Sequence, residues 1–237
     1  MGCQIALDAR HIVASDNDVL ATWSPRRQAS YGATAAGTAQ PTYKASSING
    51  RPSVQFDGTS DCMDFDSGAL AMPNNATGMV AIGVVVCDNA AADATQNAVF
   101  FSNGLLNSST RFAMRGANSS AASMNGAARR LDADSIIATG NVSGTGSPAI
   151  LQVYTDWANN LLSAAINGGT ASTNTFTLAG NCSATNSVVA KLGGQATSSA
   201  RLSGRVGAIA IATPLLGLPL RKRIRMHFGF SFRIATA

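Results

Sequence analysis

The sequence predicts an all-β fold: an antiparallel jelly-roll sandwich that closes with one short C-terminal helix. Short apolar or alternating segments follow one another along the chain, separated by turns rich in Gly, Asn, Ser and Asp. The 237 residues include no Glu and only three Lys, so strong helix formers are scarce. Convincing helical periodicity occurs once, near the C-terminus.

The clearest strand signals lie in the first half of the chain. Pro52 to Phe56 alternates between polar and apolar residues, and Asp57-Gly58 follows as a tight turn. Met79 to Cys87 is almost entirely apolar, which predicts a central strand buried on both faces. The other expected strands are Ala98 to Ser102, Arg111 to Arg115, Ile150 to Thr155, Leu161 to Ile166, Val188 to Leu192 and Arg205 to Ala212.

The expected helix begins at Pro219, a residue that suits the first helical turn. Apolar residues then recur at every fourth position from Leu220 to Phe228, which places them on one face. Gly229 is expected to end the helix. Phe230 and Phe232 alternate with polar residues, which makes a final strand plausible.

No linker, charge run or repeat divides the sequence, so residues 1–237 are expected to form one domain, with the helix and tail at about 218–237. Residues 117–128 and 170–184, rich in small side chains, are expected to be long loops. The first residues lack the basic and apolar regions of a secretory signal, and no apolar run approaches the roughly 20 residues of a membrane helix. We therefore expect a protein that is neither exported by a signal peptide nor inserted in a membrane, with free thiols at its four cysteines.

Several segments follow one another along the chain in a characteristic order. They are Trp23-Ser24, Gln40 to Tyr43, Asn49 to Gly58, Val153 to Gly168, Lys191 to Leu216 and Leu220 to Phe228. Together they resemble a laminin-G-like, concanavalin-A-like jelly-roll domain. The resemblance covers most of the chain and implies a β-sandwich. Such sandwiches include lectins, glycan hydrolases, adhesion modules and virion proteins, so function must be argued from a site. The Arg-rich ending is similar to that of tailed-bacteriophage structural proteins.

Hydrolytic chemistry is not expected. The glucanases of this fold use a pair of glutamates, and this chain has none. Asp132 and Asp134 are the nearest substitute, but Arg129 and Arg130 precede them, as in a solvated ion-paired loop. His11 and His227 are the only histidines, and no Gly-x-Ser-x-Gly elbow accompanies them.

A calcium site is one open alternative to the expectation of no cofactor. Asp57, Asp61, Asp64 and Asp66 fall within ten residues, and calcium prefers such oxygen ligands. The alternative is that these carboxylates serve turns and the surface, because Asp57-Gly58 is itself a turn signal and the spacing is not that of an EF-hand.

Sugar recognition requires an exposed aromatic ring beside polar groups. Trp157, within the turn at residues 156–160, is the candidate platform, and Tyr31 in a Gly- and Ala-rich loop is a second. The alternative for Trp157 is a ring folded onto the edge of the sandwich.

The last 17 residues hold five basic residues and no acid, whereas the rest of the chain is balanced at 12 bases and 12 acids. A basic cluster can bind nucleic acid or an acidic protein surface. No nucleic-acid-binding motif accompanies this one, so an assembly interface is preferred. Its expected members are Arg221, Arg223, Arg225, Phe228 and Arg233.

The leading functional prediction is a non-enzymatic bacteriophage structural protein, either a capsid decoration (cement) protein or an accessory tail or fibre subunit. It would be a homo-oligomer located in the virion, with the major capsid protein or a tail component as partner. The alternative is a carbohydrate-binding, lectin-like module that recognises a host surface.

Overall fold

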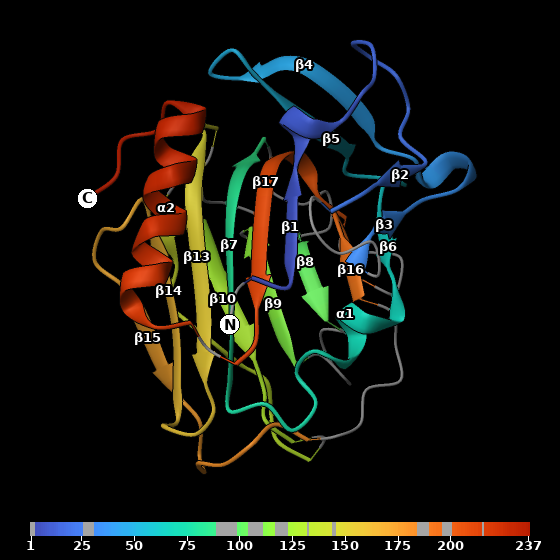
Figure 1. The fold of residues 1–237 in the computed structure, drawn as a ribbon. Coiled ribbons are helices and arrows are strands. Elements are labelled where there is room, and N and C mark those ends of the chain that lie inside the picture. Colours follow the sequence, from blue (N-terminus) through green and yellow to red (C-terminus); the bar gives the residue numbers. More distant parts are fainter. Residues whose placement is uncertain are drawn as a thin grey trace.

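The computed structural model describes residues 3–25, 31–88, 99–103, 111–116, 123–131, 133–143, 146–183, 190–195, 201–214 and 216–237. In this part of the chain two antiparallel sheets lie face to face, and one long helix covers the outside of one of them (Figure 1). This architecture confirms the predicted all-β sandwich with a C-terminal helix.

The helix-covered sheet has the strand order β15-β14-β13-β7-β17-β5-β4, and β1 pairs with β17 beside this path. All of its pairs are antiparallel. Its strands are β1 (Ile5–Asp8), β4 (Thr42–Ile48), β5 (Arg51–Asp57), β7 (Gly78–Cys87), β13 (Ala149–Asp156), β14 (Leu161–Ile166), β15 (Ser172–Thr175) and β17 (Ser203–Ala212).

The opposite sheet has the order β11-β10-β9-β8-β16-β6-β3-β2, with β12 paired to β10. Its strands are β2 (Thr22–Trp23), β3 (Ala33–Thr34), β6 (Met63–Phe65), β8 (Val99–Asn103), β9 (Phe112–Gly116), β10 (Ser123–Ala128), β11 (Ile137–Ala138), β12 (Val142–Ser143) and β16 (Ala190–Leu192). The helices of the described chain include η1 (Ala9–His11), η3 (Gly37–Ala39), α1 (Ser67–Ala71) and α2 (Leu218–Phe232). None of them has the length and apolar character needed to cross a membrane.

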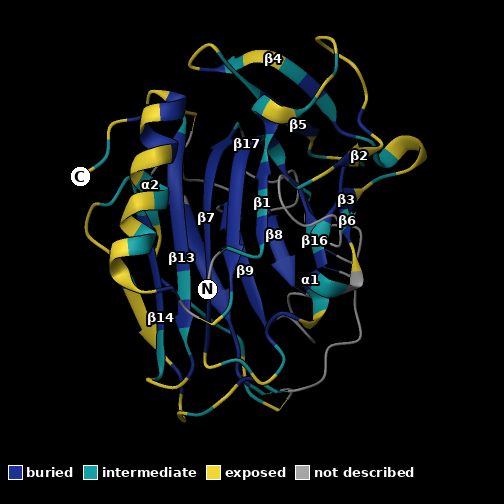
Figure 2. Ribbon diagram, in the orientation of Figure 1, coloured by how far each residue is buried: buried dark blue, intermediate teal, exposed yellow. Residues whose placement is uncertain are grey.

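Strand β7 is buried along its whole length, as predicted, because it is covered on both sides (Figure 2). Its odd-numbered side chains from Met79 to Cys87 face the core between the sheets. Its even-numbered side chains from Val80 to Val86 belong to a second apolar cluster, together with Phe228 and Phe232 of α2. Burying aliphatic side chains of this size contributes about 1.5–3 kcal/mol each, so both layers stabilise the strand.

Helix α2 lies close to the sheet because the residues beneath it are small. Strand β17 presents alternating alanines from Ala208 to Ala212 to the helix side. At the bulge in β17 next to Ala208, a Cβ on Gly207 would lie 2.6 Å from Cε1 of Phe232. Glycine is therefore needed where the end of α2 meets the sheet.

The end of α2 differs from the prediction. The helix does not stop at Gly229, and Phe230 and Phe232 are helical rather than part of a final strand. Gly229 instead allows a close approach, since a Cβ there would lie 2.7 Å from Cγ2 of Thr236 and 2.9 Å from the carbonyl oxygen of Ile234. The returning chain crosses the helix at this point, and only glycine leaves room for it.

The helix ends at Arg233, which adopts a left-handed conformation with φ of 56°. The N–H of Ile234 then donates to the carbonyl oxygen of Gly229 at 2.9 Å. This arrangement satisfies a carbonyl that the helix leaves unpaired.

Two segments expected to be loops contain strands. Ser123–Ala128 forms β10, and Ser172–Thr175 forms β15. Two of the expected strands begin at residues that the structure does not describe, Ala98 and Val188. The expected turn at 107–110 also lies outside the described residues.

Candidate functional site

The outward face of α2 is exposed along most of the helix (Figure 2). Phe230 stands out on it, because 89% of its surface is accessible to solvent. Its neighbours Phe228 and Phe232 point the other way and are buried in the cluster beneath the helix. Phe230 therefore presents its ring to solvent, where it is available to a ligand.

Phe230 stands at an open hollow of about 560 Å³. Three arginines, Arg10, Arg51 and Arg233, line the hollow with it, and no acidic residue of the described chain does. They come from η1, from the start of β5 and from the residue that ends α2. The fold therefore gathers three guanidinium groups from separate segments beside one exposed ring.

The turn between β4 and β5 fixes this arrangement. Asn49 in that turn donates from Nδ2 to the carbonyl oxygens of Phe232 at 3.0 Å and Arg233 at 3.2 Å. Asn49 has a φ of 50°, a left-handed conformation that asparagine tolerates. Arg51 follows two residues later, so the same turn places it next to the end of α2.

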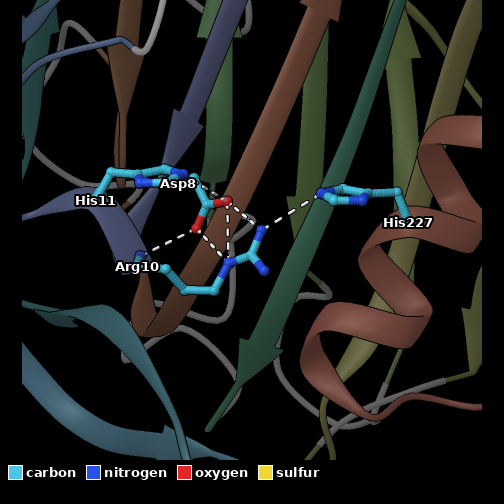
Figure 3. Close-up of polar contacts among 4 residues, drawn as sticks. All are labelled: Asp8, Arg10, His11 and His227. Atoms are coloured by element: carbon cyan, nitrogen blue, oxygen red, sulfur yellow. Dashed lines mark hydrogen bonds and ion pairs between the residues drawn. The ribbon is translucent and has the colours of Figure 1, made fainter.

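Arg10 is held in a polar cluster with Asp8, His11 and His227 (Figure 3). Its Nε donates to Oδ1 and Oδ2 of Asp8 at 2.9 and 3.1 Å, and its backbone N–H donates to Oδ1 at 3.0 Å. Its Nη2 lies 3.4 Å from Nε2 of His227, and its guanidinium carbon lies 5.3 Å from the ring centroid of Phe232. Paired nitrogen–carboxylate contacts hold a guanidinium in a defined plane, so Arg10 is fixed between η1 and α2.

A second, mainly apolar groove of about 270 Å³ lies between β1 and α2. Leu7, Ile209 and Ile224 line it together with the half-buried thiol of Cys3. Burial raises the pKa of Cys3 to about 11, although the carbonyl oxygens of Ile211 and Ile5 act in the opposite sense. All four cysteines are thiols rather than disulfides, as predicted, and the Cys3 thiol is protonated at neutral pH.

The five residues predicted as an assembly interface do not share one surface. Arg221 stacks its guanidinium carbon 4.1 Å from the ring centroid of Tyr154, and Arg225 donates from Nη2 to the carbonyl oxygen of Ala237 at 2.7 Å. Phe228 is buried and packs against the sheet. Arg223 lines the apolar groove, whereas Arg233 lines the arginine-rich hollow.

Trp157 is not an exposed platform, so that prediction is wrong. Its side chain is fully buried in the core, and its Nε1 donates to the carbonyl oxygen of Arg129 at 3.2 Å. The ring is folded inward, and it lies in the core rather than on the edge of the sandwich where the alternative placed it. Tyr31 is half-buried and packs against the same core, which leaves little of its ring for stacking.

Asp57 and Asp61 hold a turn. Oδ1 of Asp57 accepts from the N–H groups of Thr59 and Ser60 at 2.8 Å and of Asp61 at 2.9 Å. Burial acts to raise the pKa of Asp57, but these backbone donors outweigh it and lower the pKa. Burial, followed by the charge of Asp57, raises the pKa of Asp61 to about 6.

The other two aspartates of the predicted calcium site are engaged elsewhere. Asp64 forms an ion pair with Lys191, and Oδ2 of Asp66 accepts from the N–H of Gly32 at 3.2 Å. Within the described residues no three His, Cys, Asp or Glu side chains are placed to hold a metal ion. Among the described residues the four aspartates therefore serve turns, backbone contacts and an ion pair, and they do not form the cluster that the calcium alternative requires.

Of the two aspartates considered as a substitute catalytic acid pair, the structure describes Asp134. Asp134 lies 3.9 Å from Nε of Arg130, and its Oδ2 accepts from the N–H of Leu131 at 3.0 Å. This agrees with the predicted ion-paired loop for that residue. Asp132 lies outside the described residues.

Solved structures with a similar fold include a sialidase and parts of two toxins. Trypanosoma rangeli sialidase in complex with the inhibitor DANA is 12% identical, with a TM-score of 0.55 over 98% of this chain and 33% of that chain. A structure of botulinum neurotoxin type C, whose cell entry depends on interaction with two ganglioside molecules, is 11% identical, with a TM-score of 0.56 over 98% of this chain and 51% of that chain. The binding domain of Paraclostridial Mosquitocidal Protein 1 is 8% identical, with a TM-score of 0.63 over 97% of this chain and 52% of that chain.

Identities this low show the fold alone, and the chain spans only about a third to about half of those chains. No protein-family model and no curated protein matches the sequence. The β-sandwich is thereby established, while the resemblance to laminin-G-like and bacteriophage structural proteins stays a prediction.

Proposed function

We propose that this protein is a non-enzymatic carbohydrate-binding module, the lectin-like alternative predicted from its sequence. The observation that carries the proposal is the exposed ring of Phe230 beside an arginine-lined hollow. Sugars present an apolar face that packs on aromatic rings and hydroxyl groups that accept hydrogen bonds from fixed donors. Both requirements are present at this site, on the end of a helix anchored to the sandwich.

The structural neighbours support the proposal at the level of fold. Their names connect the same sandwich with a sialidase and with a toxin that interacts with gangliosides. The site itself lies on α2 and on the β4–β5 turn, so it is argued from this chain's residues and not carried over from those proteins.

A glycan microarray of neutral and acidic oligosaccharides tests the proposal, followed by calorimetric titration of the best ligand. We expect Phe230→Ala to weaken binding about tenfold or more, because the stacking face is lost. Met226→Ala is the matched control: Met226 is 53% exposed on the same helix but does not line the hollow. An array without a binder, or a Phe230→Ala protein that binds normally, would contradict the proposal.

Assembly in a virion is the second candidate function, and the exposed apolar side chains of α2 favour it. Leu218 and Met226 are 64% and 53% exposed on the same helix as Lys222 and Arg223, which are also exposed. Apolar side chains ringed by basic ones are typical of protein interfaces. Light scattering of the purified protein, alone and with capsid shells, tests this role. A monomer that does not bind to the shells would contradict it.

A further inference from the structure

The arginines of the hollow carry more charge than their surroundings neutralise. Asp8 binds Arg10, but no acidic residue among those the structure describes lines the hollow to offset Arg51 or Arg233. Nε of Arg51 is shielded from solvent, and no described residue accepts a hydrogen bond from it. A buried donor without a partner costs free energy, so the Arg51 side chain would gain from a rearrangement that brings this donor to an acceptor.

The three guanidinium groups also differ from scattered surface charges because their backbones are fixed. Asp8 and the Phe232 ring hold Arg10, and Asn49 ties the backbone of Arg233 to the turn that precedes Arg51. The planar, multiply donating guanidinium group matches the oxygens of a carboxylate or of a sulfate ester.

We propose that the hollow selects acidic sugars, in which a carboxylate or sulfate group is bound by Arg51 and Arg233 beside Arg10 while the sugar ring packs on Phe230. This inference rests on the proposed function and adds the class of glycan. The charge complementarity of the lining is the observation that carries it.

Calorimetric titration with lactose, 3′-sialyllactose and 3′-sulfolactose tests the inference and separates the two sources of negative charge. We expect at least one acidic ligand to bind about tenfold or more tightly than lactose, because a hydrogen bond to a charged group is stronger than one to a neutral group. Affinity for that ligand should fall as salt is raised from about 50 to about 500 mM, because added salt screens exposed charges.

Arg51→Gln and Arg233→Gln should each reduce the affinity for the acidic ligand about tenfold and that for lactose much less, because glutamine can still donate to a hydroxyl group but has lost the charge. Lys222→Gln is the control: it removes the same charge from the exposed side of α2 without touching the hollow. Thermal midpoints of the three variants verify that each is folded.

The outcomes separate the two proposals. Lactose that binds as tightly as both acidic ligands, with binding lost in Phe230→Ala, would overturn the inference and leave the carbohydrate-binding function intact. Acidic ligands whose affinity is unaffected by both arginine variants would also overturn it. No binding of any sugar here or on the microarray would overturn the function itself.

Discussion

At the scale of single residues, Trp157 and Phe230 differ from what the sequence predicts. Trp23 and Trp157 are buried, whereas Phe230, a purely apolar residue, is 89% exposed. Trp157 stays inside because its ring fills the core and its N–H finds a carbonyl acceptor there. The aromatic side chain available to a ligand is therefore one that the sequence assigns to a strand.

Trp157→Phe should lower stability without affecting sugar binding. The smaller ring leaves a cavity and removes the hydrogen bond from Trp157 to the carbonyl of Arg129, a combined loss of about 2–4 kcal/mol in the free energy of unfolding. Chemical denaturation measures the loss, and titration of the folded variant measures binding. A variant of unchanged stability with weakened sugar binding would mean that Trp157 belongs to the ligand site.

Asp61 should make stability depend on pH in an identifiable direction. Its pKa in the folded protein is raised to about 6 from an ordinary value of 3.8, so the folded state holds the proton more tightly than the unfolded chain. The stabilisation is complete below about pH 4, and it is lost as pH rises through about 6.

Asp61→Asn cannot ionise and should gain stability relative to the unmodified protein as pH rises through that window. The side-chain oxygen of asparagine can still accept from the N–H of Asp57, which occurs at 3.0 Å in the parent. Denaturation midpoints of both proteins between about pH 4 and about pH 7.5 measure the difference. A difference that stays constant across this range would show that Asp61 titrates normally.

At the scale of elements, the contact between the β4–β5 turn and the end of α2 determines how the residues that line the hollow are placed. Asn49→Gly preserves the left-handed backbone and removes both side-chain hydrogen bonds to α2. We expect a loss of about 1–3 kcal/mol in the free energy of unfolding and weaker sugar binding, since Arg51 and Arg233 lose their fixed separation.

Asn167→Gly is the matched control for Asn49→Gly. Asn167 also has a left-handed φ of 52°, and its Oδ1 accepts from the N–H of Ile150 at 2.8 Å, in a turn that does not line the hollow. It should lower stability without altering affinity, as measured by thermal unfolding and titration. Equal effects of both variants on affinity would mean that general stability, and not the tie to α2, governs binding.

Elements with strong local signals could be predicted from the sequence. Strands β5, β7, β13, β14 and β17 match expected segments. The spacing of their β-branched and apolar residues indicates which faces of each strand are buried. Strands β10 and β15 were missed, since their small and polar residues are also those of loops, and pairing with a neighbouring strand decides their conformation.

The candidate site could not be predicted from local sequence patterns, for a similar reason. Arg10, Arg51 and Arg233 are distant in sequence, and the tertiary contact made by Asn49 brings the last two together. Phe230 could have been identified if the helix had been extended past Gly229. Phe228 and Phe232, one turn apart, would then occupy the buried face and leave Phe230 outside.

At the scale of the whole molecule, the core between the sheets is continuous. It draws on residues from Ile5 in β1 to Ile211 in β17, including side chains from both sheets. The predicted single domain should therefore unfold in one transition, with equal calorimetric and van't Hoff enthalpies. Differential scanning calorimetry checks this, and two resolved transitions would divide the chain into independent units.

The position of β17 in the helix-covered sheet has a consequence for synthesis. β17 lies between β7 and β5, and it also pairs with β1, although all three are made long before it. While the chain emerges from the ribosome, β5 and β7 lack their shared partner, and their open edges are exposed to other chains. The sheet can close only after Ala212 has left the exit tunnel, so this sandwich cannot fold completely until β17 has been made.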